Sequence, residues 1–255
     1  MPELELAVVI PAYNEAARIV PTLDRVVTYF NALREPFEVI VVDDGSTDRT
    51  AEVVRAVGPP VRVIHLPQNR GKGAAVRTGV MACRGRLILF TDADLSTPIE
   101  EFDGFVTKLA EGYQVVIGSR ALPGSRIEVR QPWYRERMGK SFNWILRRIL
   151  PLDLADTQCG FKLFEARAAK FLFDLNRVDG FAFDAEILVL AKRFGYRIAE
   201  LPVTWRNSKA SRVHPIYHSL QMLRDLARIR FRSASGAYEA ASAEVLARAN
   251  DRGKG

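Results

Sequence analysis

The sequence predicts an α/β protein whose mostly parallel sheet is flanked by helices. Short runs rich in valine, isoleucine and leucine recur along the first half of the chain, and they are too uniformly apolar for strands with one solvated face. Stretches of helical character separate these runs. Clusters of polar residues follow the runs directly, as at the carboxyl ends of parallel strands. With 255 residues, 48% of them apolar, the chain is long enough to bury a large core.

The predicted elements alternate between strand and helix. Strands are expected at residues 6–10, 39–42, 61–66, 87–90 and 115–117. Helices are expected at residues 16–33, 48–57, 72–83 and 99–111. This order implies parallel pairing with right-handed crossovers. We expect residues 1–232 to form a single domain that ends in amphipathic helices, and residues 233–255 to form a frayed helix or a polar, flexible tail.

Composition excludes several classes of protein. Two cysteines, Cys83 and Cys159, are too few for a disulfide scaffold, and with three histidines they do not make a zinc module. No run approaches the roughly 18 apolar residues of a spanning helix. The N-terminus, with Glu3 and Glu5, does not suit a signal peptide. We therefore expect a cytoplasmic protein, either soluble or peripheral on the cytoplasmic face of a membrane.

The net charge of +7 is concentrated in two segments, residues 126–148 and 206–232, each with seven lysines or arginines. Basic segments on a mildly acidic body suggest that the protein binds phosphates or an anionic surface. Solvated helix faces are the alternative interpretation. Nucleic acid is disfavoured, because the sequence has no helix-turn-helix, RNA-binding aromatic signature or zinc finger.

Five polar clusters occur where predicted strands end. They are residues 11–15, 43–46, 69–72, 92–94 and 118–120. In a parallel sheet they share the carboxyl edge, where α/β proteins bind ligands. Ordinary turns favour the same residue types, so one cluster alone is a weak signal. Five clusters on one edge, three of them with carboxylates, indicate a site.

The carboxylates of Asp92 and Asp94 define the chemistry expected at this edge. Two aspartates two residues apart at a strand end can both face a hard divalent cation if the chain bends there. Mg²⁺ takes one or two carboxylates and completes its shell with substrate phosphate oxygens. Other motifs fail: the sequence has no G-x-G-x-x-G after its first strand, no G-x-S-x-G, and Tyr134 where a P-loop needs glycine.

Motifs in this order and spacing resemble the family-two inverting glycosyltransferases, which have a GT-A fold. The first three are residues 9–15 (VIPAYNE), 41–48 (VVDDGSTD) and 92–96 (DADLS). The resemblance continues through residues 118–120, 156–162, 183–186 and 202–205. These later motifs narrow it to the polyprenyl-phosphate sugar synthases, and most of all to the dolichyl-phosphate β-glucosyltransferases. It covers about residues 5 to 230.

The resemblance implies a donor site and a metal site. The nucleotide-sugar site would be formed by Pro11, Tyr13, Glu15, Val42, Asp44, Lys72, Asp92, Ala93, Asp94, Arg206 and Lys209. Within it, Asp44 would accept a hydrogen bond from the base. A Mg²⁺ or Mn²⁺ ion would be held by Asp92 and Asp94, with Ser96 as a poorer third ligand. For residues 46–48, helix capping is at least as good an interpretation as a ligand role.

The acceptor that the resemblance implies is a polyprenyl or dolichyl phosphate. Its second ionisation lies at about pH 6, so at neutral pH it is largely a dianion that needs cations more than a base. Those cations would be Arg126, Arg130, Arg135, Arg137, Lys140 and Lys162. The catalytic residues implied are Asp94, Arg120 and Asp156. Asp156 has the position of the family's base, but beside a dianion it would be repulsive unless paired, so orienting Lys162 or an arginine is the alternative.

Two amphipathic stretches suit a lipid interface. Their apolar residues at helical spacing are Phe142, Ile145, Leu146, Ile149 and Leu150 in the first stretch, and Ile216, Leu220, Leu223 and Ala227 in the second. Arginines flank both, so the apolar faces would enter the bilayer while the arginines meet anionic headgroups. The alternative is that both stretches pack on the domain core or against a second subunit, which would make the protein a homo-oligomer.

The leading hypothesis is metal-dependent inverting transfer of glucose from UDP-glucose to a polyprenyl or dolichyl phosphate at a membrane surface. Two alternatives keep the fold: GDP-mannose as the donor, or a glycan hydroxyl as the acceptor. A hypothesis from another class is a non-catalytic nucleotide-sugar-binding scaffold. The presence of Asp92, Asp94 and Asp156 together argues against this last hypothesis.

Overall fold

Residues 4–129, 145–150, 152–206 and 215–252 are described by the computed structural model. They contain a seven-stranded sheet in the order β3-β2-β1-β4-β7-β5-β8. The strands are β1 (Leu6–Ala12), β2 (Phe37–Asp43), β3 (Val61–His65), β4 (Leu87–Thr91), β5 (Val115–Ser119), β7 (Phe161–Glu165) and β8 (Ile198–Pro202). β7 runs antiparallel between β4 and β5, and the other pairs are parallel. The prediction of a mostly parallel sheet is confirmed.

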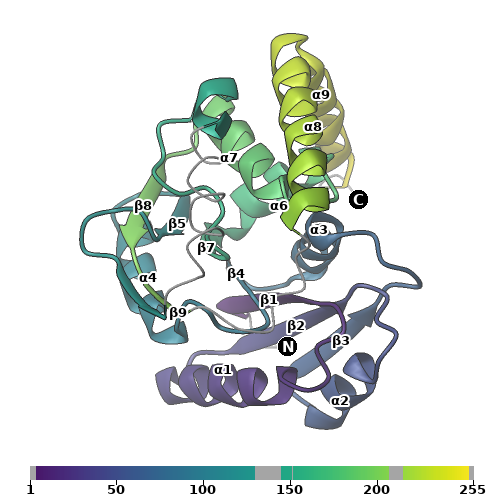
Figure 1. Ribbon diagram of the computed structural model, residues 1–255, viewed down its shortest axis with the longest axis vertical. Coiled ribbons are helices and arrows are strands. Elements are labelled where there is room, and N and C mark those ends of the chain that lie inside the picture. The colour runs from purple at the N-terminus through teal and green to yellow at the C-terminus, as the bar shows by residue number, and fades with distance from the viewer. Residues whose placement is uncertain (1–3, 130–144, 151, 207–214, 253–255) are drawn as a thin grey trace.

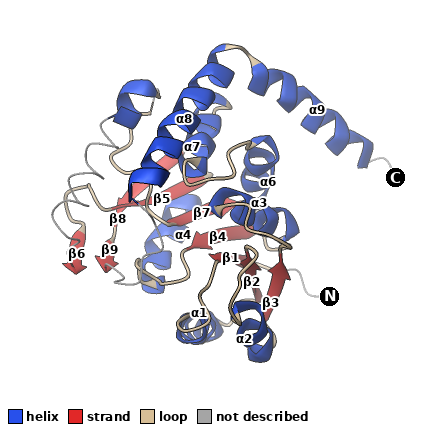
Figure 2. Cartoon of the chain, turned by 45° about the vertical axis from the view of Figure 1, so that its right-hand side comes forward, coloured by secondary structure: helices blue, strands red, loops and turns tan. Residues whose placement is uncertain are grey.

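The five predicted strands are all present, because their side chains are apolar enough to be covered on both faces. Every residue of β4 and β5 is buried, as expected for central strands of a layered sheet. A second, two-stranded sheet pairs β6 (Arg126–Val129) with β9 (Thr204–Arg206). Figure 2 shows this small sheet standing apart from the main one.

Three helices cover one face of the main sheet. They are α1 (Ile19–Leu33), α2 (Thr50–Val57) and α4 (Phe102–Ala110), with the 3-10 turn η1 (Ile99–Glu101) before α4. Their buried side chains share one core cluster with those of the sheet. Within it the rings of Phe30 and Phe102 meet edge to face, with 5.0 Å between centroids. Such a pair contributes about 0.5–1.5 kcal/mol beyond its buried area.

The opposite face is covered by α3 (Lys72–Ala82), α6 (Ala166–Leu175) and α7 (Phe183–Arg193). Outside these helices lie α8 (Pro215–Ala234), which contacts α7, and α9 (Ala237–Arg252), which contacts α6. Figure 1 shows α8 and α9 at the end of the molecule away from α1 and α2. Leu226 and Ile229 of α8 are fully buried in the core of this second face. Among the helices of the described ranges, none has the length and apolar character needed to cross a bilayer.

The direction of β7 decides where the segment before it lies. Thr91, the last residue of β4, pairs with Phe161, the first residue of β7. β7 therefore begins at the edge where the parallel strands end. Residues 152–160 lie along that edge, together with the polar clusters that the sequence placed there.

The first predicted amphipathic stretch faces the core in its described part. Residues 145–149 are helical, and Leu146 and Leu150 are buried in the cluster that α3, α6 and α7 form. Ile149 packs against the same cluster. A bilayer cannot reach these side chains, so the prediction that this apolar face enters a lipid interface is wrong for residues 145–150. Phe142 lies outside the described residues.

A helix occupies most of the region where the sequence predicted a frayed helix or a flexible tail. α9 follows a turn at Gly236 and extends to Arg252. Tyr238 is 2% exposed, and its hydroxyl donates to Glu186 Oε1 at 2.6 Å. Val245, seven residues later on the same helix face, is buried in the same core. A polar composition could not reveal this docking, because it depends on one tyrosine that finds a buried carboxylate.

We expect Tyr238→Ala to lower the free energy of unfolding by about 3–5 kcal/mol, because it empties an aromatic site in the core and removes a donor from a buried carboxylate. Urea denaturation followed by circular dichroism measures the change. Leu246→Ala on the same helix is the matched control, since that side chain is 54% exposed. Its expected effect is about 0.5 kcal/mol or less. Equal effects of the two substitutions would show that α9 does not dock through Tyr238.

Candidate active site

The acidic pair Asp92 and Asp94 lies on a tight turn at the end of β4. The Leu95 N–H donates to the Asp92 carbonyl at 3.1 Å, and the Ser96 N–H donates to Asp94 Oδ1 at 3.0 Å. Leu95 closes the turn with a φ of 44°, a left-handed conformation that costs a non-glycine residue about 1–3 kcal/mol. The turn keeps both carboxylates partly open at the sheet edge, with side-chain exposures of 32% and 20%.

Gly160 and Lys72 hold the Asp92 carboxylate from two sides. The Asp92 N–H donates to the Gly160 carbonyl at 3.2 Å, and a Cβ at Gly160 would overlap the Asp92 carboxylate. Only glycine leaves room for Asp92 here. Lys72 Nζ, at the start of α3, lies 2.8 Å from Asp92 Oδ1. Burial opposes the charge on Lys72, but Asp92 and Asp184 outweigh it and raise the pKa of Lys72 above its ordinary value.

A second lysine, Lys162, is buried in the core next to these charges. Lys162 is 1% exposed, and its ammonium donates to Asp184 Oδ1 and to the Cys159 carbonyl, both at 2.6 Å. The ammonium groups of Lys72 and Lys162 lie 5.3 and 5.7 Å from the centroid of the Phe90 ring. Because Lys162 is buried and paired, it is not available to an acceptor phosphate. The structure thus contradicts the prediction that Lys162 joins the acceptor cations.

Arg18 lies beside the acidic pair, although the sequence analysis did not single it out. Its guanidinium forms an ion pair with Glu15 and lies 3.8 Å from Asp94 Oδ2. The hydrogen bond that Arg18 donates to the Glu15 carboxylate is the main cause that raises the pKa of Arg18. Glu15 therefore orients a cation toward Asp94. No sequence signal could have found Arg18, because it lies between the first motif and α1 and belongs to neither.

The Asp44 carboxylate shapes the loop before α3. It is 3% exposed and accepts the N–H groups of Arg70 and Gly71, each at 2.8 Å. These bonds hold the loop that delivers Lys72 to Asp92. Each oxygen keeps a further lone pair, so the expected bond from Asp44 to a nucleotide base stays a prediction. Val42 is fully buried in the core, so its side chain cannot line the nucleotide pocket that the resemblance implied.

The loops after β1 and β2 are joined beside Asp44. The Asn14 N–H donates to Ser46 Oγ, Asn14 Oδ1 accepts the Thr47 N–H, and the Glu15 N–H donates to Thr50 Oγ1, each at 2.8 Å. Residues 46–50 thus have a structural role, whatever else they contact. Pro11 lies in β1, and Tyr13, directly after that strand, is 37% exposed, which leaves its ring open to a ligand.

Asp156 and Arg120 form a two-point ion pair at the same edge. Arg120 Nε and Nη2 donate to the two carboxylate oxygens at 2.6 and 2.9 Å, and the Arg120 N–H adds a third bond at 3.0 Å. Burial opposes ionisation of Asp156, but Arg120 outweighs it and holds the pKa of the carboxyl below its ordinary value. Of the two predicted partners, Asp156 orients the arginine and not Lys162. A carboxylate paired in this way is a poor proton acceptor, so the geometry favours the orienting role.

Two further residues, which the sequence analysis did not assign to the site, fix this ion pair. Glu200 on β8 accepts the N–H groups of Ala155 and Asp156 at 2.9 and 2.7 Å. The Trp205 ring centroid lies 5.6 Å from the Arg120 guanidinium carbon, within cation–π range. Trp205 belongs to the motif at residues 202–205, but no local pattern indicates either contact, because both join segments far apart in the chain.

Arg206 joins the small sheet to the acidic turn. Its N–H donates to the Ser96 carbonyl at 2.8 Å, and its guanidinium forms an ion pair with Glu128 on β6. Arg126 on β6 is exposed. The remaining predicted cations lie outside the described residues; they are Arg130, Arg135, Arg137, Lys140 and Lys209.

Three buried polar atoms at this edge have no hydrogen-bond partner within the described ranges: Thr91 Oγ1, Thr157 Oγ1 and Gln158 Nε2. Thr91 directly precedes Asp92, and the other two follow Asp156. An unsatisfied buried group of this kind costs about 1–3 kcal/mol. Such groups are rare and call for an explanation. Their position between the acidic turn and the Asp156–Arg120 pair indicates an edge that a ligand or ordered water completes.

The acidic turn fits a hard divalent cation that binds together with its substrate. Asp92 and Asp94 offer partly open carboxylate oxygens, and the missing side chain at Gly160 leaves the room that the Asp92 carboxylate occupies. In the described part of the chain, no group of three or more His, Cys, Asp or Glu side chains could hold a metal ion alone. Mg²⁺ characteristically takes one or two carboxylates and substrate phosphate oxygens, which the residues present match.

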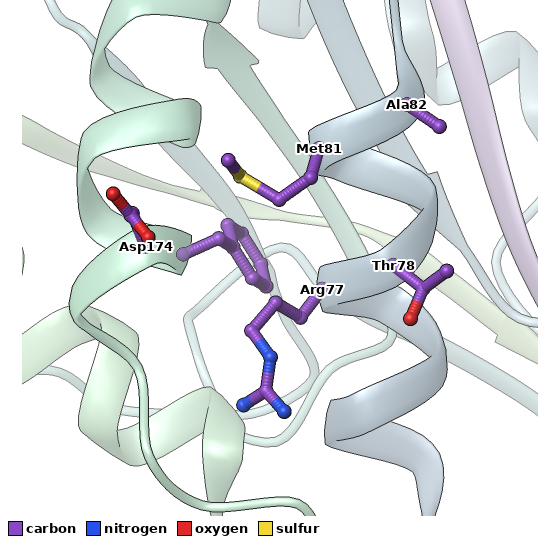
Figure 3. Close-up of a pocket in the computed structure, with 6 residues that line it drawn as sticks. Arg77, Thr78, Met81, Ala82 and Asp174 are labelled. Carbon is purple, nitrogen blue, oxygen red and sulfur yellow. The ribbon is translucent and has the colours of Figure 1, made fainter. Parts of the chain in front are cut away.

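A hollow of about 500 Å³ lies away from this edge, between α3 and α6. Figure 3 shows Arg77 and Met81 projecting from α3 toward the helix that carries Asp174. α3 begins at the acidic edge with Lys72, and Met81 is about 13 Å further along the helix axis at 1.5 Å per residue. No predicted site residue lines the hollow, so the acidic edge is the better candidate for the active site.

Known proteins share both the sequence and the fold. The family model "Glycosyl transferase family 2" matches residues 7–173. Dolichyl-phosphate beta-glucosyltransferases of Dictyostelium discoideum and Homo sapiens are 34% and 36% identical to this chain over 249 and 257 residues, which cover 92% and 93% of this chain and 76% and 78% of those proteins. A crystal structure of glucosyl-3-phosphoglycerate synthase from Mycobacterium tuberculosis in complex with Mn²⁺, UDP-glucose and glycerol 3-phosphate is 25% identical, with a TM-score of 0.66 over 89% of this chain and 80% of that one.

The sheet, its helical layers and the acidic edge therefore define a glycosyltransferase of GT-A type. The chain belongs to glycosyl transferase family 2. The fold class and the family that the sequence motifs predicted are confirmed.

We expect Gly160→Ala to weaken binding of UDP in the presence of Mn²⁺ by at least about tenfold, because the new methyl group must displace the Asp92 carboxylate. Titration calorimetry measures the affinity. Gly104→Ala is the control, since a Cβ there would meet only Leu201 Cδ1 at 3.9 Å. An unchanged affinity in a folded Gly160→Ala protein would remove Asp92 from the nucleotide site.

We expect Asp156→Asn to lower the rate of glycosyl transfer by about 100-fold without changing the shape of its pH profile. The reason is that Asp156 already carries its charge at neutral pH and acts by holding Arg120, so no proton transfer is removed. Initial rates measured from acidic to alkaline pH test this. Asp153→Asn, an exposed position on the same segment, is the control. Loss of the acidic limb of the profile in Asp156→Asn would identify Asp156 as the base instead.

Proposed function

We propose that the protein transfers glucose from UDP-glucose to dolichyl phosphate or a related polyprenyl phosphate, with inversion at the anomeric carbon. One observation carries the proposal: the segment of Asp156, paired with Arg120, continues to Gly160, which lies against Asp92. A metal–diphosphate site at Asp92 and a site for a second phosphate at Arg120 would thus be neighbours. The names of the two relatives support glucose, a β product and the lipid acceptor. The Mn²⁺ and UDP-glucose in the crystal structure support the donor and a divalent cation.

In the donor site, one group of residues would bind the nucleoside and another would bind the diphosphate and its metal ion. Tyr13 and Asp44 would contact the nucleoside, while Lys72 and Arg18 place positive charge beside Asp92 and Asp94. Asp92 and Asp94 would hold the Mg²⁺ or Mn²⁺ ion, which neutralises charge developing on the leaving UDP when it is bound. These groups are held by the fold before substrate arrives, and such preorganisation is usually the largest contribution to catalysis.

The acceptor end would act by position and charge. An acceptor phosphate oxygen forms the new bond to the anomeric carbon while the bond from that carbon to the UDP oxygen breaks. Because the acceptor is largely a dianion at neutral pH, no base has to remove a proton. Arg120, held by Asp156 and Trp205, would supply a fixed positive charge. Arg126 and Arg206 on the small sheet add further positive charge.

The protein would work at a membrane surface, because a polyprenyl acceptor resides in a bilayer. The second predicted amphipathic stretch supports this in part. Leu220 is 66% exposed and Ala227 is exposed, while Leu223 packs partly against the core. The face of α8 that includes Leu220 and Ala227 is therefore open to a lipid interface.

A panel of radiolabelled nucleotide sugars with polyprenyl phosphate, with and without Mg²⁺ or Mn²⁺, tests the proposal. We expect labelled lipid from UDP-glucose and a divalent cation. If only GDP-mannose gives labelled lipid, the donor is GDP-mannose and not UDP-glucose. If the labelled product is a glycan, the acceptor is a glycan hydroxyl and not a lipid phosphate. No transfer to any lipid phosphate would overturn the proposal.

We expect Asp92→Asn and Asp94→Asn each to lower glucosyl transfer by about 100-fold or more, because each removes a charged oxygen from the site of the metal and diphosphate. Rates are measured with saturating UDP-glucose and a fixed cation concentration. Asp24→Asn, an exposed position on α1, is the charge-matched control. Full turnover by either site variant would exclude that aspartate from the metal site.

A further inference from the structure

A polar pit of about 180 Å³ lies between α8 and the segment before α7. It is lined by Arg177, Val178, Asp179, Gly180, Gln221, Asp225, Arg228 and Arg232. Three of its eight lining residues are arginines. At about 30 Å³ for each water molecule, the pit has room for about six waters, which is ample for a phosphate group.

The carboxylates around the pit do not balance its arginines. Asp179 is engaged from outside the pit, since Arg77 Nη2 lies 2.7 Å from its Oδ1. Asp225 accepts from Arg228 Nη1 at 3.1 Å. Arg232 lies 3.6 Å from the buried carboxylate of Glu186.

Arg177 has no carboxylate partner within the described ranges. Its Nη1 donates only to the main-chain carbonyls of Asp174 and Asn176. A guanidinium has five N–H donors, so the arginines of the pit keep donors for a further oxygen-rich group. The local surplus of positive charge therefore suits an anion with several acceptor oxygens.

An exposed apolar stripe runs along α8 beside the pit. Leu220, Ala227 and Phe231 are spaced at i, i+7 and i+11, so they share one face of the helix, and Phe231 is 72% exposed. Three pit residues of α8 each follow a residue of the stripe directly in the sequence; they are Gln221, Arg228 and Arg232. Pit and stripe are therefore adjacent strips of one helix. Leu220 is 66% exposed and Ala227 is exposed too, so no part of the described chain covers this stripe.

We propose that the pit binds the phosphate headgroup of an anionic phospholipid while Leu220, Ala227 and Phe231 enter the adjoining acyl region. The occupant is a bilayer, because cationic donors lie directly beside an open aromatic and aliphatic stripe, which is how helices at a lipid interface are built. Among the described residues, those that line the pit make no hydrogen bond or ion pair with Arg120 or Asp156, so the pit is separate from the proposed acceptor site. This proposal rests on the proposed function, which requires a membrane surface, and adds that the surface contains anionic phospholipid.

The first test measures binding of the full-length chain to vesicles by flotation. We expect binding to phosphatidylcholine vesicles that contain phosphatidylglycerol, and little binding to phosphatidylcholine alone. Arg177→Lys and Arg228→Lys keep the charge but lose the planar fork that grips a phosphate, so each should weaken binding by about fivefold. Arg230→Lys, an exposed position on α8 outside the pit, should leave binding unchanged.

The second test concerns the apolar stripe. Phe231→Ser should weaken vesicle binding by about tenfold, because a large apolar side chain no longer leaves water. Leu246→Ser on α9 is the control, since that side chain is exposed but lies off α8. Thermal melting confirms that each variant is folded.

The outcomes separate this inference from the proposed function. If the lysine variants inside and outside the pit bind alike, attachment follows net charge and the pit is not a headgroup site. Binding that needs no anionic lipid would also overturn the inference. Glucosyl transfer to a detergent-dispersed polyprenyl phosphate should be unchanged in Arg177→Lys and Phe231→Ser. Absence of that activity in the unmodified protein would count against the proposed function alone.

Discussion

The contact between Gly160 and the Asp92 carboxylate is the constraint on which the rest of the structure depends. It exists because β7 runs antiparallel to β4, so that the chain enters β7 at the edge where β4 leaves its acidic turn. A side chain at residue 160 would push Asp92 away from Lys72. The same entry into β7 brings Asp156 to Arg120 at the end of β5. One strand direction thus places two separate charged sites beside each other.

The charged groups of this edge are held in pairs. Asp92 faces Lys72, Asp94 faces Arg18, Asp156 faces Arg120, and Asp184 faces Lys162. Burying any of these charges without its partner would be strongly unfavourable, because the interior solvates a lone ion poorly. The pairs therefore fix one another's positions before substrate arrives. Lys162 is paired in the same way, but its bond to Asp184 lies in the core, where it contributes to stability and not to binding the acceptor.

Glu186 connects the C-terminal helices to the rest of the molecule. Its buried carboxylate accepts from Tyr238 of α9 and from the main-chain N–H groups of Arg177 and Val178. The same group therefore docks α9 and shapes one wall of the arginine-lined pit. α8 is divided between two environments, with Leu226 and Ile229 in the core and Phe231 exposed. The buried face fixes the helix relative to the sheet and leaves the other face open for the bilayer contact that we propose.

The sequence by itself determined the first five strands, the polar edge, the acidic pair and the family, because uniformly apolar runs and turn residues are local patterns that one segment carries alone. Only the tertiary structure decided which charges meet. Arg120 and Asp156 are 36 residues apart and Glu186 and Tyr238 are 52 apart, and no local pattern encodes such partners. The same reason explains where the structure differs from the sequence-based expectations. Leu146, Lys162 and Tyr238 are buried because segments distant in the chain cover them. Periodicity shows that a residue has an apolar or charged face, whereas the folded chain decides what that face contacts.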